Sequence, residues 1–521
     1  MEKNKHYKNY FILTLSVILI FVSSLPVFLG FQYQSSDLLF SGFYFGTEDG
    51  NSYIAKMLSG AFGAWLFETP YSAYDQNGFF AFFPYILLGK LTSMPAQRLQ
   101  LIVLFHLFRM AGIVFLIAQT YKFIAIFLTN EKITRLATVI FVIGGGWGWI
   151  NLFIGKRLPL EFYSPETFGF LMVLGLPHLC FARAFLLLSI RYFVKNYDQP
   201  EWKKNVLCSS CALFLAGIFQ PMNLAIGFAI LFGWQIFLLI TRKTVLLEVL
   251  KRSFIWVILP GLFFIYNFSY FKLDPYLSSW ESQNILPSPP VWDYLFSYGF
   301  GIFCLIYYSL FFKKKHFDKI KNFDFLIVWT IIFPFLVYSP VNVQRRLAEG
   351  YWIVLSIFIA YFFLGRKFKG FHIPIMVSLM LSQLLFLGGA FTTIKLRQEP
   401  VYIKTTLFDL CNYLNFDAEF HDIILAPYED SNVLPTCAPI KTLNGHGPES
   451  KNLLVLNEII DTFYDGTIDK AEWEILREEF NIKYIIIPSE FEETVAKEII
   501  NSYGEISFQN KDYFVIKNKD N

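Results

Sequence analysis

Two adjacent carboxylates, Glu48 and Asp49, stand in the stretch "YFGTEDGNSYIAKM", a few residues beyond a long apolar run. A carboxylate can act as a general base that removes a proton from a hydroxyl group. The alternative is structural, because Asp49 or Asn51 can cap a helix that contains Tyr53, and acidic residues suit the positive end of a helix dipole. The local sequence leaves both interpretations open, and one position can serve in both.

Two arginines, Arg345 and Arg346, stand in "SPVNVQRRLAEG", where positive charge is otherwise sparse. Guanidinium groups match phosphate oxygens with paired hydrogen bonds and can stabilise a departing phosphate. The alternative is contact with lipid headgroups at a membrane surface. His178, in "GLPHLCFARAF", follows a proline near the end of an apolar segment, where it either lines a pocket or makes structural hydrogen bonds.

The histidines and cysteines give no metal signal. His446 stands alone in the turn "NGHGPES", and Cys208 and Cys211 lie inside an apolar run with no second pair nearby, so we assign no metal ligands. Cys411 and Cys437 both lie in the C-terminal part of the chain. A disulfide between them is permitted in an oxidising compartment, and the sequence leaves open whether they pair.

The elements that must position these residues are membrane helices. A mean hydropathy of +0.44, with 61 Phe and 19% aromatic residues among 521, excludes a soluble enzyme. The net charge of +3 gives no indication of nucleic-acid binding. Apolar windows of about 20 residues, long enough to cross a membrane, recur over the first 390 positions. They predict about 11 transmembrane helices, over residues 10–31, 99–121, 136–154, 168–194, 206–219, 222–240, 254–271, 295–312, 325–339, 350–365 and 371–391.

The basic residues predict the orientation of these spans. The N-terminus has a basic start and a long apolar stretch without a cleavage site, which indicates an uncleaved signal-anchor helix. Lysines and arginines then gather in alternate loops, provided that 206–240 is a hairpin that turns at "QPMN". We expect a cytoplasmic N-terminus, an extracytoplasmic C-terminus, and a first loop, residues 32–98, that places Glu48 and Asp49 outside. The basic loops lie near 122–135, 191–204, 242–252, 313–321 and 366–369.

The first outer loop and the C-terminal part have their own elements. In the loop, Tyr53, Met57 and Leu58 have helical spacing and predict an amphipathic helix on the membrane surface, followed by a short apolar helix over 79–91. Residues 394–521 alternate strand-length apolar runs with helical patterns and predict a small α/β domain. The strands are expected in "DIILA", "KYIIIPS" and "YFVIKN", and the helices in "SKNLLVLNEIIDTFYD", "KAEWEILREEF" and "EFEETVAKEII".

This arrangement resembles the GT-C membrane glycosyltransferases, which include the protein mannosyltransferases and the aminoarabinose transferases. The resemblance lies in the acidic pair beyond a first helix that starts inside, the long first outer loop, the many spans and the outer C-terminal domain. The segments "EDGNSYIAKMLSGAFGAWLFETPYS", "GLPHLCFARAFLLL", "VNVQRRLAEGYWI" and "LNGHGPES" look like those of bacterial members of that superfamily. Where relatives often have a histidine after the "PY" stretch, this chain has Asp75.

The resemblance implies a GT-C-like transmembrane domain, residues 1–393, and an extracytoplasmic α/β domain, residues 394–521. It implies an enzyme of the bacterial cytoplasmic membrane that moves a sugar from a polyprenyl-phosphate carrier to an acceptor hydroxyl on the outer face. Asp49 matches the catalytic base with Glu48 as its neighbour, and Arg345 and Arg346 would hold the phosphate. His178 and Asp75 are further candidates for substrate binding.

Several features stay open at this point. No cofactor is required, and dependence on a divalent metal is undecided, as are the sugar and the acceptor. The expected partners are the lipid-linked sugar donor and membrane lipids, with no nucleic acid. A transporter or lipid flippase is the first alternative, although the sequence lacks the repeated halves common in transporters. A non-catalytic membrane assembly protein is the second.

Overall fold

The computed structural model describes residues 2–94, 97–155, 157–195, 197, 199–311, 320–363, 370–495 and 503–518. The chain forms two compact units. The helical unit contains Met1–Leu25, Phe108–Ser269 and Ile285–Gly389. The mixed unit contains Pro26–Leu107, Tyr270–Asn284 and Ala390–Asn521, so it combines most of the predicted first loop with the predicted C-terminal domain. The basic segments predicted within 312–319 and 364–369 lie outside the described residues.

Eight helical segments in the described ranges are long and apolar enough to cross a membrane. The chain is therefore a polytopic helical membrane protein, while the total of eleven spans stays a prediction. The eight segments are Tyr7–Gln32, Gln97–Ile124, Glu131–Leu152, Pro177–Lys195, Met222–Ile240, Leu246–Leu273, Gln344–Phe363 and His372–Leu396.

These segments correspond to named helices of the chain. They are α1 (Glu2–Gln32), α4 (Gln97–Ile124), α5 (Glu131–Ile143) with η1 (Gly148–Leu152), α8 (Pro177–Lys195), α10 (Met222–Ile240), α11 (Leu246–Leu273), η3 (Gln344–Ala348) with α15 (Trp352–Phe363), and α16 (His372–Leu396). Further helices are α6 (Leu160–Tyr163), α7 (Phe170–Gly175), α9 (Trp202–Phe219), α13 (Val291–Phe311) and α14 (Phe323–Val337).

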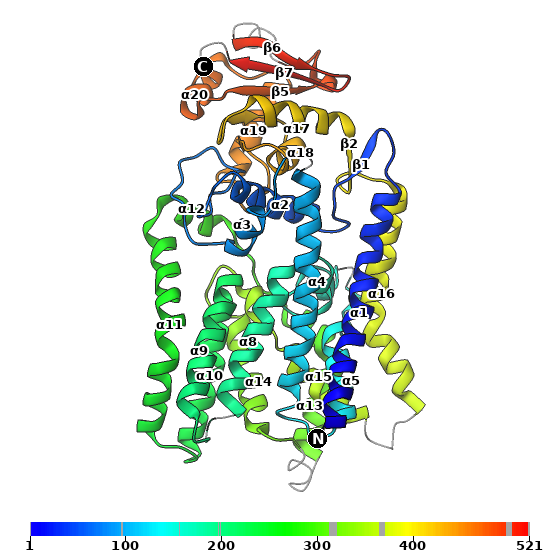
Figure 1. Ribbon diagram of the computed structural model, residues 1–521, viewed down its shortest axis with the longest axis vertical. Helices are drawn as coiled ribbons and strands as arrows, with labels where there is room; N and C mark the ends of the chain where they lie inside the picture. Colours follow the sequence, from blue (N-terminus) through cyan, green and yellow to red (C-terminus); the bar gives the residue numbers. More distant parts are fainter. Residues whose placement is uncertain are drawn as a thin grey trace. The chain divides into compact units, whose positions relative to one another are not determined.

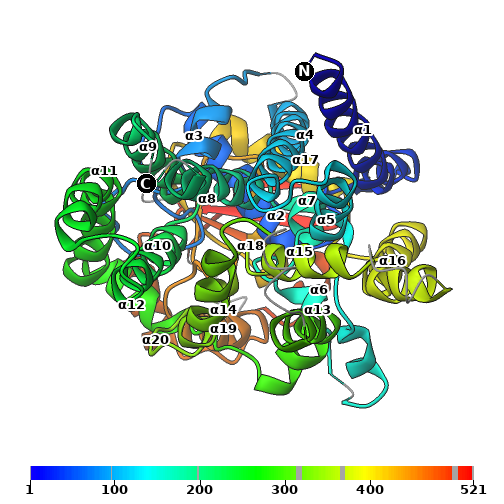
Figure 2. The same cartoon turned by 90° about the horizontal axis from the view of Figure 1, so that it is seen from below.

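The helical unit packs around one apolar core. In Figure 1, α8, α9, α10 and α14 run side by side, and Figure 2 shows them nearly end-on. The helix α15 is buried along its whole length and contacts α5 and α13. The break expected at 220–223 is present, because α9 ends at Phe219, Gln220 is extended, and α10 begins at Met222.

The mixed unit contains a five-stranded sheet. Its strand order is β4-β3-β5-β7-β6, in which β3 is parallel to β4 and β5, and β7 is antiparallel to β5 and β6. A separate antiparallel pair joins the first loop to the start of the C-terminal part. The strands are β1 (Leu38–Phe40), β2 (Tyr402–Lys404), β3 (Ile423–Leu425), β4 (Lys441–Thr442), β5 (Tyr484–Pro488), β6 (Gly504–Gln509) and β7 (Tyr513–Asn518).

Helices cover both faces of this sheet, because its central strand is apolar on both sides. Side chains alternate along a strand, so Tyr484 and Ile486 of β5 face one way while Ile485 and Ile487 face the other. The first pair packs in a core with α17 (Thr405–Asp417), and the second in a core with α19 (Leu453–Tyr464) and α20 (Lys470–Phe480).

The predicted C-terminal elements are present in most cases. The three predicted strands correspond to β3, β5 and β7, and two predicted helices correspond to α19 and α20. The helix predicted in "EFEETVAKEII" begins at position 490, where the described residues form the short turn η6 (Ser489–Phe491), and its second half lies outside the described residues.

Three helices from elsewhere in the sequence complete the mixed unit. They are α2 (Thr47–Ala61) and α3 (Phe83–Gly89) from the first loop, and α12 (Pro275–Gln283). The helix α2 contacts α3, α18 (Tyr428–Val433) and η5 (Leu434–Thr436). The expectation that α2 lies on the membrane surface is wrong. Tyr53, Met57 and Leu58 are buried by the protein itself, as is the polar side of the helix.

Candidate active site

The helix α2 positions the two acidic residues. It begins at Thr47, after Gly46, which serves as the N-cap in the left-handed region at φ 55° and supplies no side-chain hydrogen bond. Glu48 and Asp49 therefore lie inside the first turn, where the helix dipole favours negative charge. The interpretation of Asp49 or Asn51 as the cap is wrong, because the helix starts earlier than the local sequence indicated. The Asp49 carboxylate is thus available for contacts with other segments.

Asp49 contacts a histidine from the far end of the chain. Its Oδ1 lies 3.1 Å from Nε2 of His446, and Oδ2 accepts no hydrogen bond from the described residues. The Asp49 side chain is 53% exposed, whereas that of His446 is 6% exposed. The neighbouring Glu48 is also exposed, and its Oε2 accepts a hydrogen bond of 3.3 Å from the hydroxyl of Tyr428.

A buried glutamate stands behind the histidine. Oε1 of Glu449 lies 3.4 Å from Nδ1 of His446 and 2.5 Å from Nζ of Lys56. The hydroxyls of Ser52 and Thr69 donate hydrogen bonds to its two oxygens, at 2.7 and 2.9 Å. We call Asp49, His446, Glu449 and Lys56 the carboxylate–histidine cluster. Asp49 is the member that reaches solvent.

Lys56 sits in an aromatic cage. Its Nζ lies 4.3 Å from the ring centre of Phe82, 5.3 Å from that of Phe67 and 5.6 Å from that of Tyr53. A buried ammonium group is stabilised by ring faces and by a paired carboxylate, and it is very unfavourable without them. Glu449 is therefore the counter-ion that allows Lys56 to be buried within α2.

The cluster shifts the pKa values of its members. Burial lowers the pKa of Lys56, although the negative charges of Glu449 and Asp49 act in the opposite direction. Burial alone would lower the pKa of His446, but the hydrogen bond with Asp49 and the nearby Glu449 carboxylate raise it to about 9. Burial alone would raise the pKa of Glu449 and of Asp49, but their cationic partners hold both below the usual values. Near neutral pH, His446 is therefore protonated and Asp49 is ionised.

The segment that carries His446 and Glu449 is held by its backbone. Gly445 has a φ of +149°, and a Cβ there would lie 2.5 Å from the ring of Tyr71, so only glycine fits at this position. The helix α12 contacts the next residues. Trp280 donates to the carbonyl of Pro448, and Tyr276 donates to that of Glu449 at 3.0 Å. The histidine is thereby fixed relative to α2.

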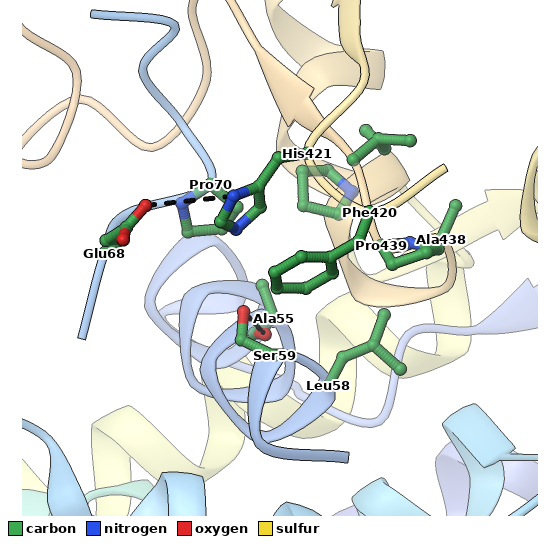
Figure 3. A pocket seen from close by; sticks show the side chains of 11 residues that line it. Ala55, Leu58, Ser59, Glu68, Pro70, Phe420, His421, Ala438 and Pro439 are labelled. Carbon is green, nitrogen blue, oxygen red and sulfur yellow. Dashed lines mark hydrogen bonds and ion pairs between the residues drawn. The ribbon is translucent and has the colours of Figure 1, made fainter. Parts of the chain in front are cut away.

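Asp75 does not belong to this cluster. It is exposed in the irregular segment between α2 and α3 and takes part in none of the cluster's hydrogen bonds. A different ionic group lies in the same unit, where Glu68 contacts Lys441 at 3.0 Å. Glu68 also contacts His421, at 3.9 Å (Figure 3). The cavity beside it has about 10 Å³, which is room for about one water molecule and no substrate.

The two predicted phosphate ligands lie on η3 in the helical unit. The guanidinium of Arg345 lies 5.0 Å from the ring centre of Tyr163, and its Nε has no hydrogen-bond partner among the described residues. Arg346 is 42% exposed and lies 3.9 Å from Oε1 of Glu166, a distance at the limit of an ion pair. Each guanidinium group therefore has a donor that is unused or only weakly paired, which is buried in Arg345 and exposed in Arg346.

A buried ion pair holds the segment that carries these arginines. Arg183 of α8 pairs with Glu349, next to η3, and donates to the carbonyl of Glu166 at 2.6 Å. His178 is half-buried in the first turn of α8, one residue after Pro177. The predicted span 168–194 is divided at this point, because α7 ends at Gly175 and α8 begins at Pro177. A cavity of about 690 Å³ in the same unit is lined by Lys195, Lys243, Asp324 and their neighbours, and by none of the predicted site residues.

Three members of the cluster are not predicted from the sequence. Lys56 and Glu449 are 393 positions apart, and each looks like an ordinary surface charge in its own stretch. His446 was singled out but received no role. The detectable signal was the Gly-His-Gly-Pro turn, which is typical of a fixed backbone that presents one side chain. Among the described residues, no group of three or more His, Cys, Asp or Glu has an arrangement that could hold a metal ion.

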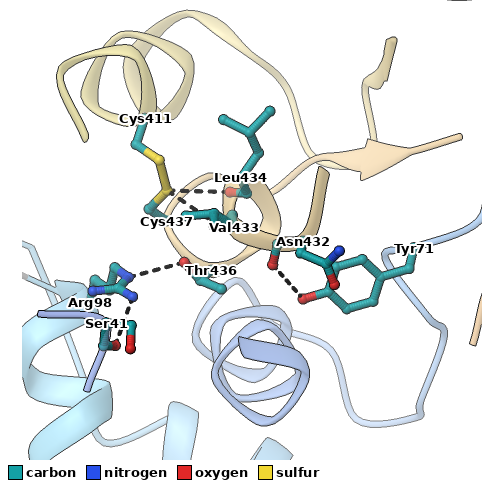
Figure 4. The surroundings of a disulfide bond; sticks show 9 residues. All are labelled: Ser41, Tyr71, Arg98, Cys411, Asn432, Val433, Leu434, Thr436 and Cys437. Atoms are coloured by element: carbon teal, nitrogen blue, oxygen red, sulfur yellow. Dashed lines mark hydrogen bonds between the residues drawn. A yellow bond between two sulfur atoms is a disulfide. The ribbon is translucent and has the colours of Figure 1, made fainter. Parts of the chain in front are cut away.

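The two C-terminal cysteines are bonded to each other. The Cα atoms of Cys411 and Cys437 are 5.7 Å apart, and the bond joins α17 to the end of η5 (Figure 4). Next to the disulfide, Thr436 accepts a hydrogen bond of 3.0 Å from Nε of Arg98. The Nη2 group of Arg98 donates a second hydrogen bond to the carbonyl of Ser41. The disulfide thus lies on the segment that contacts α2.

Comparison with known proteins identifies the fold. No protein-family model and no curated protein sequence matches the chain. Among solved structures, it is similar to the oligosaccharyltransferase of Archaeoglobus fulgidus tethered with an acceptor peptide that contains the NVT sequon. The identity is 11%, the TM-score is 0.53, and the match covers 99% of this chain and 75% of that one. The same identity holds for the oligosaccharyltransferase AglB of that organism in complex with an inhibitory peptide and a dolichol-phosphate, with a TM-score of 0.51 and coverage of 96% and 73%.

A bacterial structure gives a weaker match. ArnT from Cupriavidus metallidurans in the apo state matches with 11% identity, a TM-score of 0.45, and coverage of 99% of this chain and 98% of that one. The fold assignment rests on the two archaeal structures. The resemblance that the sequence indicated is confirmed at the level of the fold: this chain is a polytopic helical membrane protein with the fold of the GT-C membrane glycosyltransferases.

Proposed function

We propose that this chain transfers a sugar from a polyprenyl-phosphate carrier to an acceptor hydroxyl, with Asp49 as the group that takes the proton. The observation that carries the proposal is an exposed carboxylate, held ionised by a buried cluster, in a chain with the GT-C fold. The AglB structure in complex with a dolichol-phosphate supports a lipid-phosphate carrier as the donor.

The proposed reaction is a single displacement at the anomeric carbon, in which the acceptor oxygen replaces the phosphate oxygen. The acceptor oxygen forms a bond to the anomeric carbon of the sugar, and the bond from that carbon to the phosphate oxygen breaks. The polyprenyl phosphate leaves with the electron pair of that bond. The hydroxyl proton becomes strongly acidic as the new bond forms, so a carboxylate with a low pKa is still an adequate base. Oδ2 of Asp49, which accepts no hydrogen bond from the described residues, would receive this proton.

Arg345 and Arg346 are proposed to bind the phosphate of the carrier. The support is that Arg345 has an unused Nε donor among the described residues and that Arg346 is weakly paired and exposed. Guanidinium groups stabilise the negative charge that grows on a leaving phosphate.

Three further residues are proposed near the substrate. His178 and Asp75 would make lesser contacts to it. Glu48 would be the polar neighbour of Asp49, and its carboxylate accepts a hydrogen bond from Tyr428.

We further propose that the mixed unit faces the outside of a bacterial cytoplasmic membrane. The alternation of basic loops supports a cytoplasmic N-terminus and an outer C-terminus. The disulfide between Cys411 and Cys437 supports an oxidising compartment for the C-terminal part.

The test is donor turnover by the purified chain in proteoliposomes. The probes are undecaprenyl-phosphate-linked hexoses and pentoses, and the readout is release of free undecaprenyl phosphate in the presence of a membrane lipid and peptide extract as the acceptor source. We expect release from at least one donor. Transbilayer movement of an intact labelled donor, without cleavage, would instead favour a flippase.

A further inference from the structure

Four charged side chains form one connected row, from solvent into the protein. The order is Asp49, His446, Glu449 and Lys56, with contacts of 3.1, 3.4 and 2.5 Å. Each ring nitrogen of His446 faces a different carboxylate. Nε2 is hydrogen-bonded to Asp49, whereas Nδ1 has no hydrogen bond among the described residues and lies only in an ion pair with Glu449. A turn of the imidazole would lose at least one of these contacts, so they favour one orientation of the ring.

The row is electrically balanced when His446 carries a proton. Two carboxylates then face one ammonium and one imidazolium group. Glu449 and Lys56 are almost completely buried, so an unbalanced charge there would be costly. Neutralisation of His446 would leave one excess negative charge on the row. The buried part therefore favours a protonated histidine next to Asp49.

His446 also determines which oxygen of Asp49 is free. Oδ1 is engaged by the histidine, and Oδ2 accepts no hydrogen bond from the described residues. The backbone at Gly46 leaves space beside Oδ2, since even an added Cβ would lie 3.6 Å from it. One oxygen is anchored, the other accepts no hydrogen bond from the described residues, and the side chain that carries both is half-exposed.

We propose that His446 is a positioning residue for sugar transfer, which anchors one oxygen of Asp49 and keeps this carboxylate ionised, and that Glu449 and Lys56 hold His446 in place. The inference rests on the proposed function. It adds that sugar transfer requires His446 and Glu449 from the C-terminal part of the chain. The base on α2 is then competent only when the 444–450 turn is folded against it.

Other groups around the histidine do not replace this role. The ring of Tyr71 lies 5.9 Å from that of His446, and burial raises the pKa of Tyr71 well above its usual value, so it stays neutral. Tyr428 is also neutral near pH 7, because burial and then Glu48 raise its pKa. The charged groups that act on His446 are Asp49, Glu449 and Lys56, which are the other members of the row.

The first experiment measures the protonation of His446 directly. The full chain, labelled with ¹³C-histidine in detergent, is titrated by NMR, and His446→Gln identifies the His446 signal among the seven histidines. We expect the signal to titrate near pH 9 in the wild-type chain and at lower pH in Asp49→Asn and in Glu449→Gln. His421→Gln, a histidine outside the row, should leave it unchanged. An unaltered His446 titration in both row variants would overturn the inference.

The second experiment compares transfer rates and pH profiles in the proteoliposome assay. We expect His446→Gln to lower turnover about 100-fold, the cost of a misplaced catalytic group, and to move the acid limb of the profile to higher pH. That shift follows because Asp49 loses its cationic partner, and a merely structural histidine would not produce it. His421→Gln should keep the wild-type rate and profile.

Two results separate this inference from the proposed function. If Asp49→Asn abolishes transfer while His446→Gln keeps both rate and profile, the inference is wrong and the function stands. If Asp49→Asn transfers sugar at the wild-type rate, the proposed mechanism is wrong. The row then serves folding alone, and the inference is overturned with the mechanism.

Discussion

At the residue scale, the cluster behind Asp49 converts an ordinary acidic side chain into one with a defined orientation and charge. Asp49 lies in the first helical turn, and its partner His446 comes from the other end of the sequence. The adjacent Glu48 shares the helix dipole but contacts a tyrosine instead. The two neighbouring carboxylates are therefore in different electrostatic environments, which gives them different expected roles.

Removal of the buried ammonium group should destabilise the mixed unit. In Lys56→Met, the Glu449 carboxylate stays buried without its main counter-ion, and breaking such a pair costs about 3–5 kcal/mol. We expect a lower melting temperature for the purified chain, measured by intrinsic fluorescence in detergent. The double variant Lys56→Met/Glu449→Gln, in which no charge is left uncompensated at this pair, should regain part of the loss. If the single variant melts like the wild type, the pair contributes nothing to stability.

Stability should also depend on pH through His446. Its pKa is raised from 6.5 to about 9 in the folded chain, so folding is favoured by proton binding. This contribution is complete below pH 6.5 and is lost as the pH rises through about 9. The melting temperature should fall over that interval, and less steeply in His446→Gln. Equal slopes for the two proteins would contradict the assignment of this titration to His446.

At the element scale, local patterns predicted the helices and strands better than they predicted contacts. The runs "KAEWEILREEF" and "KYIIIPS" became α20 and β5, because apolar periodicity reports which faces are buried. The same logic failed for α2, since Lys56 looks like the polar side of a surface helix until Glu449 is placed beside it. A contact between positions 393 apart has no local signal.

The segment η3 should contribute to binding of the lipid-linked sugar donor. Arg345→Ala removes a guanidinium that we propose binds phosphate, and hydrogen bonds to charged groups contribute about 1.5–3 kcal/mol. We expect kcat/KM for the lipid-linked donor to fall roughly 10- to 100-fold, measured in proteoliposomes at matched protein content. The matched control is Arg157→Ala, an exposed arginine that pairs with Asp293 at 3.9 Å in the same unit. A similar loss in both variants would remove the specific role of Arg345.

At the scale of the whole molecule, transfer on the outer face requires the mixed unit to lie on the extracytoplasmic side of the membrane. Eight membrane-length helices lie in the described ranges, and the orientation comes from the distribution of basic residues. A reporter that is active only in the cytoplasm should give no signal when it is fused after residue 521, and a signal when it is fused before residue 1. Activity of the C-terminal fusion would place Asp49 and His446 inside and would contradict transfer on the outer face.

The substitution Asp49→Asn removes the carboxylate that we propose takes the proton in sugar transfer. Asparagine keeps the shape of the side chain, and the structure shows that no helix cap is lost. A general base contributes about 10²- to 10⁴-fold in rate, or roughly 3–5 kcal/mol of barrier. Glu429→Gln, an exposed acid in the first turn of α18, is the matched control and should keep the wild-type rate. Glu48→Gln should have a smaller effect than Asp49→Asn.

The measurement is release of undecaprenyl phosphate by wild type, Asp49→Asn, Glu48→Gln and Glu429→Gln at equal amounts of folded protein. On the proposal that Asp49 is the base, we expect Asp49→Asn to insert and fold normally, but to release the carrier at least about 100-fold more slowly than the wild type. Wild-type turnover by folded Asp49→Asn would contradict it.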